Sequence, residues 1–373
     1  MAHQSDIDFV SLGTVDIDEI RVPGCQPMLD VLGGSGAFST LGFRIFNGGA
    51  QAQTTGCLVL AGNDFPDAAR RELEQWGATL VVKEDAQNAS TRGLVKYAES
   101  MCGPKSYTHT HTTTPLTPVS MDLPILLLSS NTFHFLATPK ELLDQVPFLT
   151  ALRKAHGIKA PALIIWEPTP SSCVPANRPS FLTACKIVDV FSPNHVDLCA
   201  LFSDIPEKNF DRKNIVARAY HFVGAKSWDK APAMVLVHCG EHGSLLLPRD
   251  PKPKWLPAYY GQDAEGVVDA TGAGSAFLGG FAAGWIESGG NVKEASVYGA
   301  VSASFAVEQV GLPVLTGGGK GERWNGVAVG ERMKVFRKKL EDMEMAEMME
   351  AMRLASLKPI KAMNGPDWIS RRH

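Results

Sequence analysis

The residues best suited to chemistry in this sequence run from Asp269 to Ser275, D-A-T-G-A-G-S. An apolar run ends at Asp269, and a stretch of small residues that predicts a helix follows the glycines. Such a strand-to-helix turn gathers backbone N–H groups at the positive end of a helix dipole, where proteins bind phosphate. The pattern therefore predicts an anion hole at Gly272-Ala273-Gly274, with the Thr271 hydroxyl beside it.

Ser275 stands where a phosphotransferase of this design needs a carboxylate to take the proton of the attacking hydroxyl. A serine hydroxyl is too weak a base at neutral pH, and such a base typically contributes a factor of roughly 10²–10⁴. Three readings stay open. In the first reading, the chain is a kinase that uses another acid (Asp18, Glu241 or Asp269) or an acidic substrate. In the second, it is a pseudokinase that binds nucleotide and acts through a protein partner. The third and lowest-ranked reading is a different reaction with Ser275 as ligand contact or nucleophile, because no Ser–His pair is evident.

The motif resembles the late signature of the ribokinase/PfkB family of carbohydrate and nucleoside kinases, roughly D-T-T-G-A-G-D-A-F, with Ser275 at the position of the catalytic aspartate. It is most similar to the fungal Mak32-like branch, where that acid is also replaced. Four other motifs of the family precede this signature in the chain, in the order that the family has them. They are G-T-V-D-I-D from Gly13, Gly33-Gly34, N-H-V-D from Asn194 and G-E-H-G from Gly240. The resemblance covers roughly residues 8 to 315.

The resemblance implies ATP-dependent phosphorylation of a hydroxyl on a sugar, nucleoside or similar polyol, with ATP and Mg²⁺ as cofactors. The implied substrate contacts are Asp16, Asp18, Gly33 and Gly34, and the implied nucleotide contacts are Asn194, Gly240, Gly243, Thr271 and Asp269. Mg²⁺ would lie at Asn194 and Asp197 through water, and a monovalent cation near Asp269. Without the resemblance, Asn194 is also a common helix N-cap, Asp18 a solvated strand residue and the glycine pair a plain turn.

Apolar strand patterns alternate with helical ones along the rest of the chain. We expect strands at 9–12, 57–62, 125–129, 162–166, 188–191, 234–237 and 267–268. This alternation favours a parallel sheet with helices on both faces. Residues 14–22 and 91–113 read as half-exposed strands of a small β lid. The expected fold is α/β, a ribokinase-like three-layer αβα core with a mostly parallel sheet over residues 8–330, followed by an amphipathic helix and tail over 331–373.

Composition excludes several classes of partner. The net charge is −3, from 36 basic and 39 acidic residues, which argues against nucleic acid. No apolar run is long enough to predict a membrane partner, and the polar N-terminus shows no secretory signal. Seven cysteines without a C-x-x-C pair predict reduced thiols, a cytoplasmic location and no zinc site. An exposed lid edge would invite homodimerisation, and a partner protein is the alternative.

Two further patterns carry less weight. His109-x-His111 has the alternation of a ligand pair, but no third ligand is nearby in sequence, so an exposed lid strand explains it better. Gly317-Gly318-Gly319-Lys320 fails the spacing of a phosphate-binding G-x-x-x-x-G-K-[ST] loop.

Overall fold

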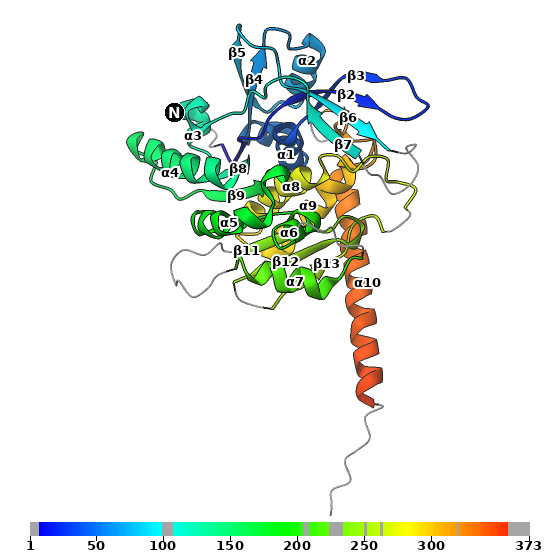
Figure 1. The fold of residues 1–373 in the computed structure, drawn as a ribbon. Helices are drawn as coiled ribbons and strands as arrows, with labels where there is room; N and C mark the ends of the chain where they lie inside the picture. The colour runs from blue at the N-terminus through cyan, green and yellow to red at the C-terminus, as the bar shows by residue number, and fades with distance from the viewer. Residues whose placement is uncertain are drawn as a thin grey trace, which may run out of the picture.

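A nine-stranded sheet forms the centre of the molecule, in the order β13-β12-β11-β10-β9-β8-β1-β4-β5. The computed structural model describes residues 7–98, 107–203, 209–223, 234–249, 252–261, 264–318 and 321–356 (Figure 1). Seven strands are parallel: β1 (Phe9–Ser11), β4 (Thr55–Gly62), β5 (Thr79–Asp85), β8 (Thr132–Ala137), β9 (Leu163–Pro168), β10 (Val190–Phe191) and β11 (Met234–His238). The antiparallel strands β12 (Ser244–Pro248) and β13 (Lys254–Leu256) extend one edge.

Helices cover both faces of this sheet. One face carries α1 (Ser35–Arg44), α2 (Asp67–Gln75), α8 (Ala273–Glu287), α9 (Val292–Ala306) and the base of α10 (Val329–Ser356). The other carries α3 (Ile125–Leu128), α4 (Pro139–Ala155), α5 (Arg178–Ala184), α6 (His195–Ala200) and α7 (Arg212–Tyr220). Successive strand residues such as Phe9 and Val10 enter opposite cores. The predicted three-layer αβα fold is confirmed.

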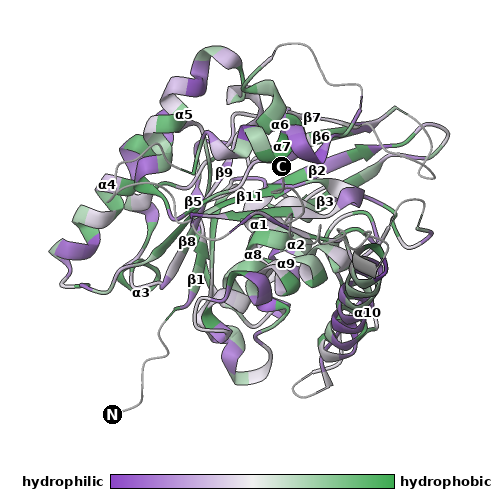
Figure 2. Ribbon diagram, turned by 90° about the horizontal axis from the view of Figure 1, so that it is seen from below, coloured by the Kyte–Doolittle hydropathy of each residue, from purple (hydrophilic) through white to green (hydrophobic). Residues whose placement is uncertain are grey.

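Small residues let α8 pack closely in its layer. A Cβ on Gly279 would lie 1.9 Å from the Ser39 carbonyl oxygen of α1, and one on Gly280 would lie 2.5 Å from the Ser302 Cβ of α9. Figure 2 shows the apolar character of α8 and of the central strands, in contrast to the mixed surface of α10. The helix that begins at the predicted anion hole is thus held firmly between two neighbours.

A separate four-stranded sheet stands beside the main body, in the order β3-β2-β6-β7 (Figure 1). Its strands are β2 (Asp16–Arg21), β3 (Met28–Gly33), β6 (Arg92–Tyr97) and β7 (Tyr107–His111), with β2 and β6 parallel and the other pairs antiparallel. This is the predicted lid, and we use that name for it below. The turn expected at Gly103-Pro104 lies outside the described residues.

Short elements complete the chain. The strands β14 (Leu315–Thr316) and β15 (Arg323–Trp324) pair with each other, and 3₁₀ turns cover 49–54, 120–122, 170–172, 175–177, 185–187 and 240–242.

None of the helices in the described ranges combines the length and apolar character needed to cross a bilayer. The six described cysteines are thiols rather than members of disulfides, and Cys102 lies outside those ranges. The same holds for the tail beyond Ser356.

Three predicted elements were wrong. The apolar run at 125–129 is the short helix α3, which begins after Pro124, and the strand is β8 seven residues later. Residues 267–268 form no strand, because the N–H groups of Val268 and Asp269 both donate to the Val307 carbonyl at the end of α9. The strand within 14–22 is buried over most of its length, because Ile17 packs in the core of the main body and Ile20 packs in a small core of the lid.

Candidate functional site

Polar side chains gather at the carboxyl ends of neighbouring parallel strands. Ser11 ends β1, His134 lies in β8, Glu167 lies near the end of β9 and His238 ends β11. Because these ends meet at one edge of the sheet, residues far apart in sequence come together, as at most ligand sites of parallel α/β folds.

A buried hydrogen-bond chain links three of these strands. His134 Nδ1 lies 2.9 Å from Ser11 Oγ, and its Nε2 lies 3.1 Å from Glu167 Oε2. Ser11 Oγ accepts the N–H of Gly13 at 3.0 Å, which leaves its own proton for His134 Nδ1. The tautomer of His134 with its proton on Nε2 therefore satisfies both contacts and donates to Glu167. These hydrogen bonds through Ser11 and His134 hold the carboxylate of Glu167 in place.

The first turn of α8 faces the same carboxylate. Ser275 Oγ donates to Glu167 Oε2 at 2.8 Å. Gly272 caps the helix in the left-handed region at φ +75°, and Thr271 N–H donates to Asp269 Oδ1 at 2.9 Å. A Cβ on Gly274 would meet nothing closer than Glu167 Oε1 at 3.4 Å, so the backbone there is approachable. First-turn N–H groups have no acceptor within their own helix, and this geometry suits an anion.

Burial and neighbouring groups shift the pKa values of three titratable side chains at this edge of the sheet. Burial alone would raise the pKa of Glu167, but the hydrogen bonds of His134 and Ser275 hold it below its ordinary value. Burial and the charge of Glu167 raise the pKa of Asp197 to about 7. Burial lowers the pKa of His238 to about 4, so this imidazole is neutral at physiological pH. Its Nε2 lies 2.9 Å from Ser192 Oγ, whose own proton goes to the Leu236 carbonyl.

Asn194 and Asp197 open α6 beside this cluster. Asn194 Oδ1 accepts the N–H of Asp197 at 2.8 Å, so the cap is real, and Asn194 Nδ2 donates to Asp197 Oδ2 at 2.6 Å. Burial and, secondly, the charge of Glu167 disfavour the ionised form of Asp197 and raise its pKa. A hard divalent cation relieves such a conflict and prefers carboxylate and amide oxygens, so these residues fit Mg²⁺.

The glycine pair after β11 forms a tight 3₁₀ turn. Gly240 and Gly243 have φ of +54° and +89°, and a Cβ on Gly243 would lie 2.0 Å from the Leu256 carbonyl oxygen. Glu241, one of the acids considered as a substitute base, is half exposed, and its Oε1 lies 3.6 Å from His242 Nε2. This turn has a structural reason for its glycines whether or not it contacts a nucleotide.

The predicted substrate residues meet in the lid. Asp16 pairs with Gly33 across β2 and β3, and a Cβ on Gly33 would come within 2.5 Å of Asp18 Oδ2. Gly34 has φ +88°, and a Cβ there would lie 3.0 Å from Asp16 Cγ. His109 of β7 joins them, with Nε2 3.3 Å from Asp18 Oδ1. Burial raises the pKa of Asp18, and the hydrogen bond to Asp18 raises that of His109.

One lid residue touches the anion-hole turn directly. The Tyr97 hydroxyl of β6 donates to Asp269 Oδ1 and lies 3.3 Å from Thr271 Oγ1. The position of the lid is therefore coupled to the loop that precedes α8.

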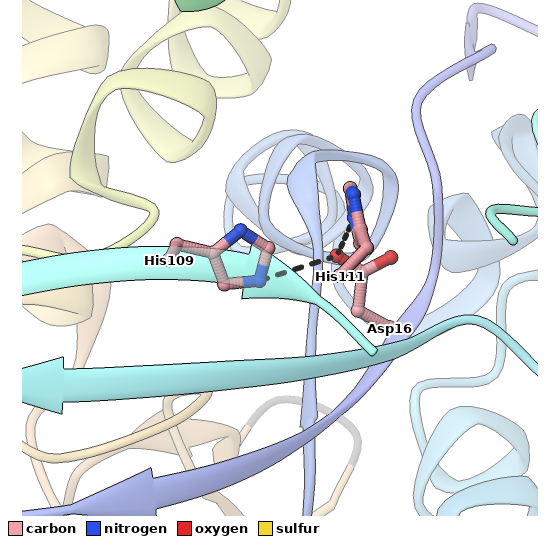
Figure 3. Close-up of side chains that lie close together, drawn as sticks. All are labelled: Asp16, His109 and His111. Carbon is pink, nitrogen blue, oxygen red and sulfur yellow. Dashed lines mark ion pairs between the residues drawn. The ribbon is translucent and has the colours of Figure 1, made fainter. Parts of the chain in front are cut away.

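Three functional candidates were missed or discounted in the sequence. Glu167 is the acid that contacts Ser275, and its signal in the sequence is an apolar run that ends in an acid. His134 lies inside an apolar strand and gives no signal of its own. The histidine pair of β7 was taken for an exposed strand, but Asp16 supplies a third group from a distant strand (Figure 3).

The sequence matches the description pfkB family carbohydrate kinase over residues 50–314. The uncharacterized protein C16C9.01c of Schizosaccharomyces pombe is 30% identical over 349 residues, which are 89% of this chain and 93% of that protein. Protein MAK32 of Saccharomyces cerevisiae is 27% identical over 82% of this chain and 85% of its own length. A Salmonella deoxyribokinase is 30% identical over 41% of this chain and 43% of its own length.

Solved structures share the fold. An Escherichia coli protein described as a ribokinase II, in complex with ATP and Mg²⁺, has a TM-score of 0.59 at 16% identity over 89% of this chain and 99% of its own. A Cryptococcus neoformans ribokinase in complex with ADP has a TM-score of 0.54 at 21% identity over 83% of this chain and 96% of its own.

Proposed function

The chain belongs to the pfkB family of carbohydrate kinases, and on this premise we propose that it transfers a phosphoryl group from ATP to a hydroxyl of a sugar, nucleoside or similar polyol, with Glu167 as the final proton acceptor. The single observation that carries the proposal is the hydrogen bond from Ser275 Oγ to Glu167 Oε2 at 2.8 Å. The carboxylate of Glu167 is thus hydrogen-bonded to Ser275, at whose position the family has its catalytic aspartate.

In this proposal each group has one task. The first turn of α8 would hold the phosphates, Asn194 and Asp197 would hold Mg²⁺, and Asp16 and Asp18 would bind acceptor hydroxyls. ATP with Mg²⁺ supplies the phosphoryl group and offsets the charge that spreads over its oxygens during transfer. The fit of this donor set rests on the glycine-lined first turn and on the uncompensated buried carboxylate of Asp197.

The proton then moves over two short steps. As the acceptor oxygen bonds to phosphorus and the bond to the leaving oxygen breaks, the acceptor proton passes to Ser275 Oγ, and Ser275 passes its own proton to Glu167. The lowered pKa of Glu167 keeps this carboxylate ionised at neutral pH. His134 holds Glu167 in place from behind and keeps it from turning away.

The test compares wild type with Glu167→Gln, Ser275→Asp and the control Glu241→Gln, using Mg²⁺-ATP and a panel of sugars and nucleosides. We expect phosphorylated product from wild type and from Glu241→Gln. Glu167→Gln should lose a factor of roughly 10²–10⁴ in kcat, the usual contribution of a general base. The affinity for ATP, measured by calorimetry, should stay within about threefold in every variant, because these side chains are not the ones that hold the phosphates.

The rival reading is a pseudokinase that binds nucleotide and acts through a protein partner. It predicts ATP binding without product in wild type and product only in Ser275→Asp, and that result would overturn the proposal. Full activity in Glu167→Gln would leave a kinase but remove its assigned proton acceptor.

A further inference from the structure

Three potential metal-ligating side chains converge in the lid. Asp16 projects from β2, and His109 and His111 project from the same face of β7, two residues apart (Figure 3). Their ligand atoms lie within 4.8 Å of one another. Asp16 Oδ2 is 3.5 Å from His111 Nε2 and 3.9 Å from His109 Nε2. We call these three residues the lid triad.

The spacing of the triad suits a shared ion better than direct hydrogen bonds. Both separations are longer than a good N–H···O bond, for which 2.7–3.2 Å is usual. Ligands bound at about 2.0–2.2 Å to a tetrahedral ion lie about 3.3–3.6 Å apart, as the edges of the tetrahedron. The observed gaps lie at or slightly above this edge length, so a small inward movement of His109 would complete the geometry.

Asp16 is a buried carboxylate with one unsatisfied oxygen. Its side chain is only 4% exposed, Oδ2 faces the histidines, and among the described residues no donor reaches Oδ1. A buried carboxylate oxygen without a partner costs free energy, and it is rare in folded proteins. A cation bound at Asp16 would offset the charge of this carboxylate, which is a second reason, beside the spacing, to expect an ion here.

A glycine on the intervening strand makes the convergence possible. Gly93 of β6 pairs with Asp18 on one side and with His111 on the other. A Cβ at Gly93 would come within 2.0 Å of Asp18 Oδ1 and 2.4 Å of His109 Nε2. Its absence opens a gap that side chains from β2 and β7 enter from both sides. Asp18 Oδ1 lies 3.3 Å from His109 Nε2 and helps to orient this imidazole.

From this arrangement we propose that the lid binds a divalent transition-metal ion, with Zn²⁺ as the best fit, through Asp16, His109 and His111. Two imidazoles with a carboxylate suit Zn²⁺ and its neighbours in the transition series, whereas Mg²⁺ and Ca²⁺ prefer oxygen ligands alone. The histidines are 31% and 37% exposed, so an ion can enter from solvent. The site shares Asp16 with the acceptor-binding residues of the proposed function, but binding of the ion itself needs neither ATP nor an acceptor.

The test measures metal binding by full-length protein without a histidine tag, in the absence of nucleotide and with a phosphine as reductant. Zn²⁺ affinity is measured by competition with a chromogenic chelator, and the visible absorption of Co²⁺ reports geometry and ligand type. We expect one Zn²⁺ per chain, a tetrahedral Co²⁺ spectrum without thiolate charge-transfer bands, and a loss of at least tenfold in affinity in His109→Ala and in His111→Ala. The matched control His156→Ala removes an exposed histidine elsewhere and should bind like wild type.

Two results would overturn the proposal. One is an affinity in His109→Ala and His111→Ala within about twofold of wild type. The other is X-ray absorption of the wild-type Zn²⁺ complex that shows sulfur ligands, or no imidazole, around the ion. The second measurement needs no variant, so the proposal stays testable even where a substitution disturbs the lid. Circular dichroism of each variant checks that the fold persists.

Discussion

At the scale of single residues, Ser275, which we expect at the position of the family's aspartate, contacts a carboxylate on another strand. That carboxylate is Glu167, 108 residues earlier in the chain. In the proposed function, Glu167 therefore takes the role of the aspartate through one additional hydrogen bond. This is why we favour a relocated proton acceptor over an inert nucleotide-binding scaffold.

The pH dependence of transfer follows from the state of Glu167. A base acts when it is deprotonated, and the pKa of Glu167 is held below its ordinary value, so the base stays available down to acidic pH. At saturating Mg²⁺, ATP and acceptor, we expect log kcat to be flat from about pH 5.5 to about pH 8 and to fall only below the usual glutamate range near 4.3. A steady-state pH profile checks this, with circular dichroism to confirm folding at each pH.

One shape of the pH profile would contradict this expectation. An acid limb with a midpoint between about pH 6 and 7 that persists at saturating Mg²⁺ would contradict Glu167 as the base and point to a group that titrates there, either a histidine or Asp197.

Sequence reasoning located some of these residues and missed others for a physical reason. The glycines around Ser275 are recognisable in the sequence because the turn before α8 needs them locally, as the left-handed φ of Gly272 requires. Glu167 and His134 act only through contacts made when distant strands align, and nothing in the flanking sequence encodes that register. The same holds for Asp16 and His111, which are 95 positions apart in the chain.

At the scale of elements, the lid and the anion-hole turn are joined at Tyr97. Its buried hydroxyl donates to Asp269 Oδ1, and the Thr271 N–H donates to the same oxygen. The lid was predictable from its half-exposed strands, but β3 and the burial of β2 were not. They depend on a four-stranded order in which β2 is internal, and a local pattern does not reveal this order.

Removal of that hydroxyl should weaken the link between lid and turn. In Tyr97→Phe we expect a loss of about 1–3 kcal/mol in the free energy of unfolding, typical of a hydrogen bond to a charged group in a buried setting. The KM for ATP should rise more than kcat falls, because Asp269 also orients Thr271. Urea unfolding and steady-state kinetics measure both effects.

The control for this variant is Tyr220→Phe, which removes a hydroxyl from a half-exposed ring on α7. It should leave the free energy of unfolding within about 0.5 kcal/mol of wild type, as surface substitutions usually do. Equal effects of the two substitutions would contradict the proposed link.

At the scale of the whole molecule, the three layers follow from the alternation of strands and helices, and the chain end adds a helix that extends beyond the body (Figure 1). The base of α10 belongs to the core, because Phe336 is fully buried and Arg332 pairs with Glu308 at 2.8 Å. Its outer half is different, because residues 341–350 are all exposed. The expected boundary near residue 331 therefore falls inside a helix whose first turns stabilise the sheet.

Two truncations separate these halves. Removal of 343–373 deletes the exposed side chains of 343–350 and the surface pair of Lys293 with Glu344, which is worth little, so we expect the Tm to stay within about 2 °C of wild type. Removal of 329–373 uncovers the site of Phe336 and leaves Glu308 without Arg332. This should cost at least about 3–5 kcal/mol, the usual cost of deleting a buried phenylalanine side chain alone. Thermal unfolding followed by circular dichroism measures both.

A large loss of Tm on removal of 343–373 would mean that the exposed methionines of α10 are covered in solution by a second copy of the chain. Sedimentation of the full chain and of this truncated form would then show different masses of assembly.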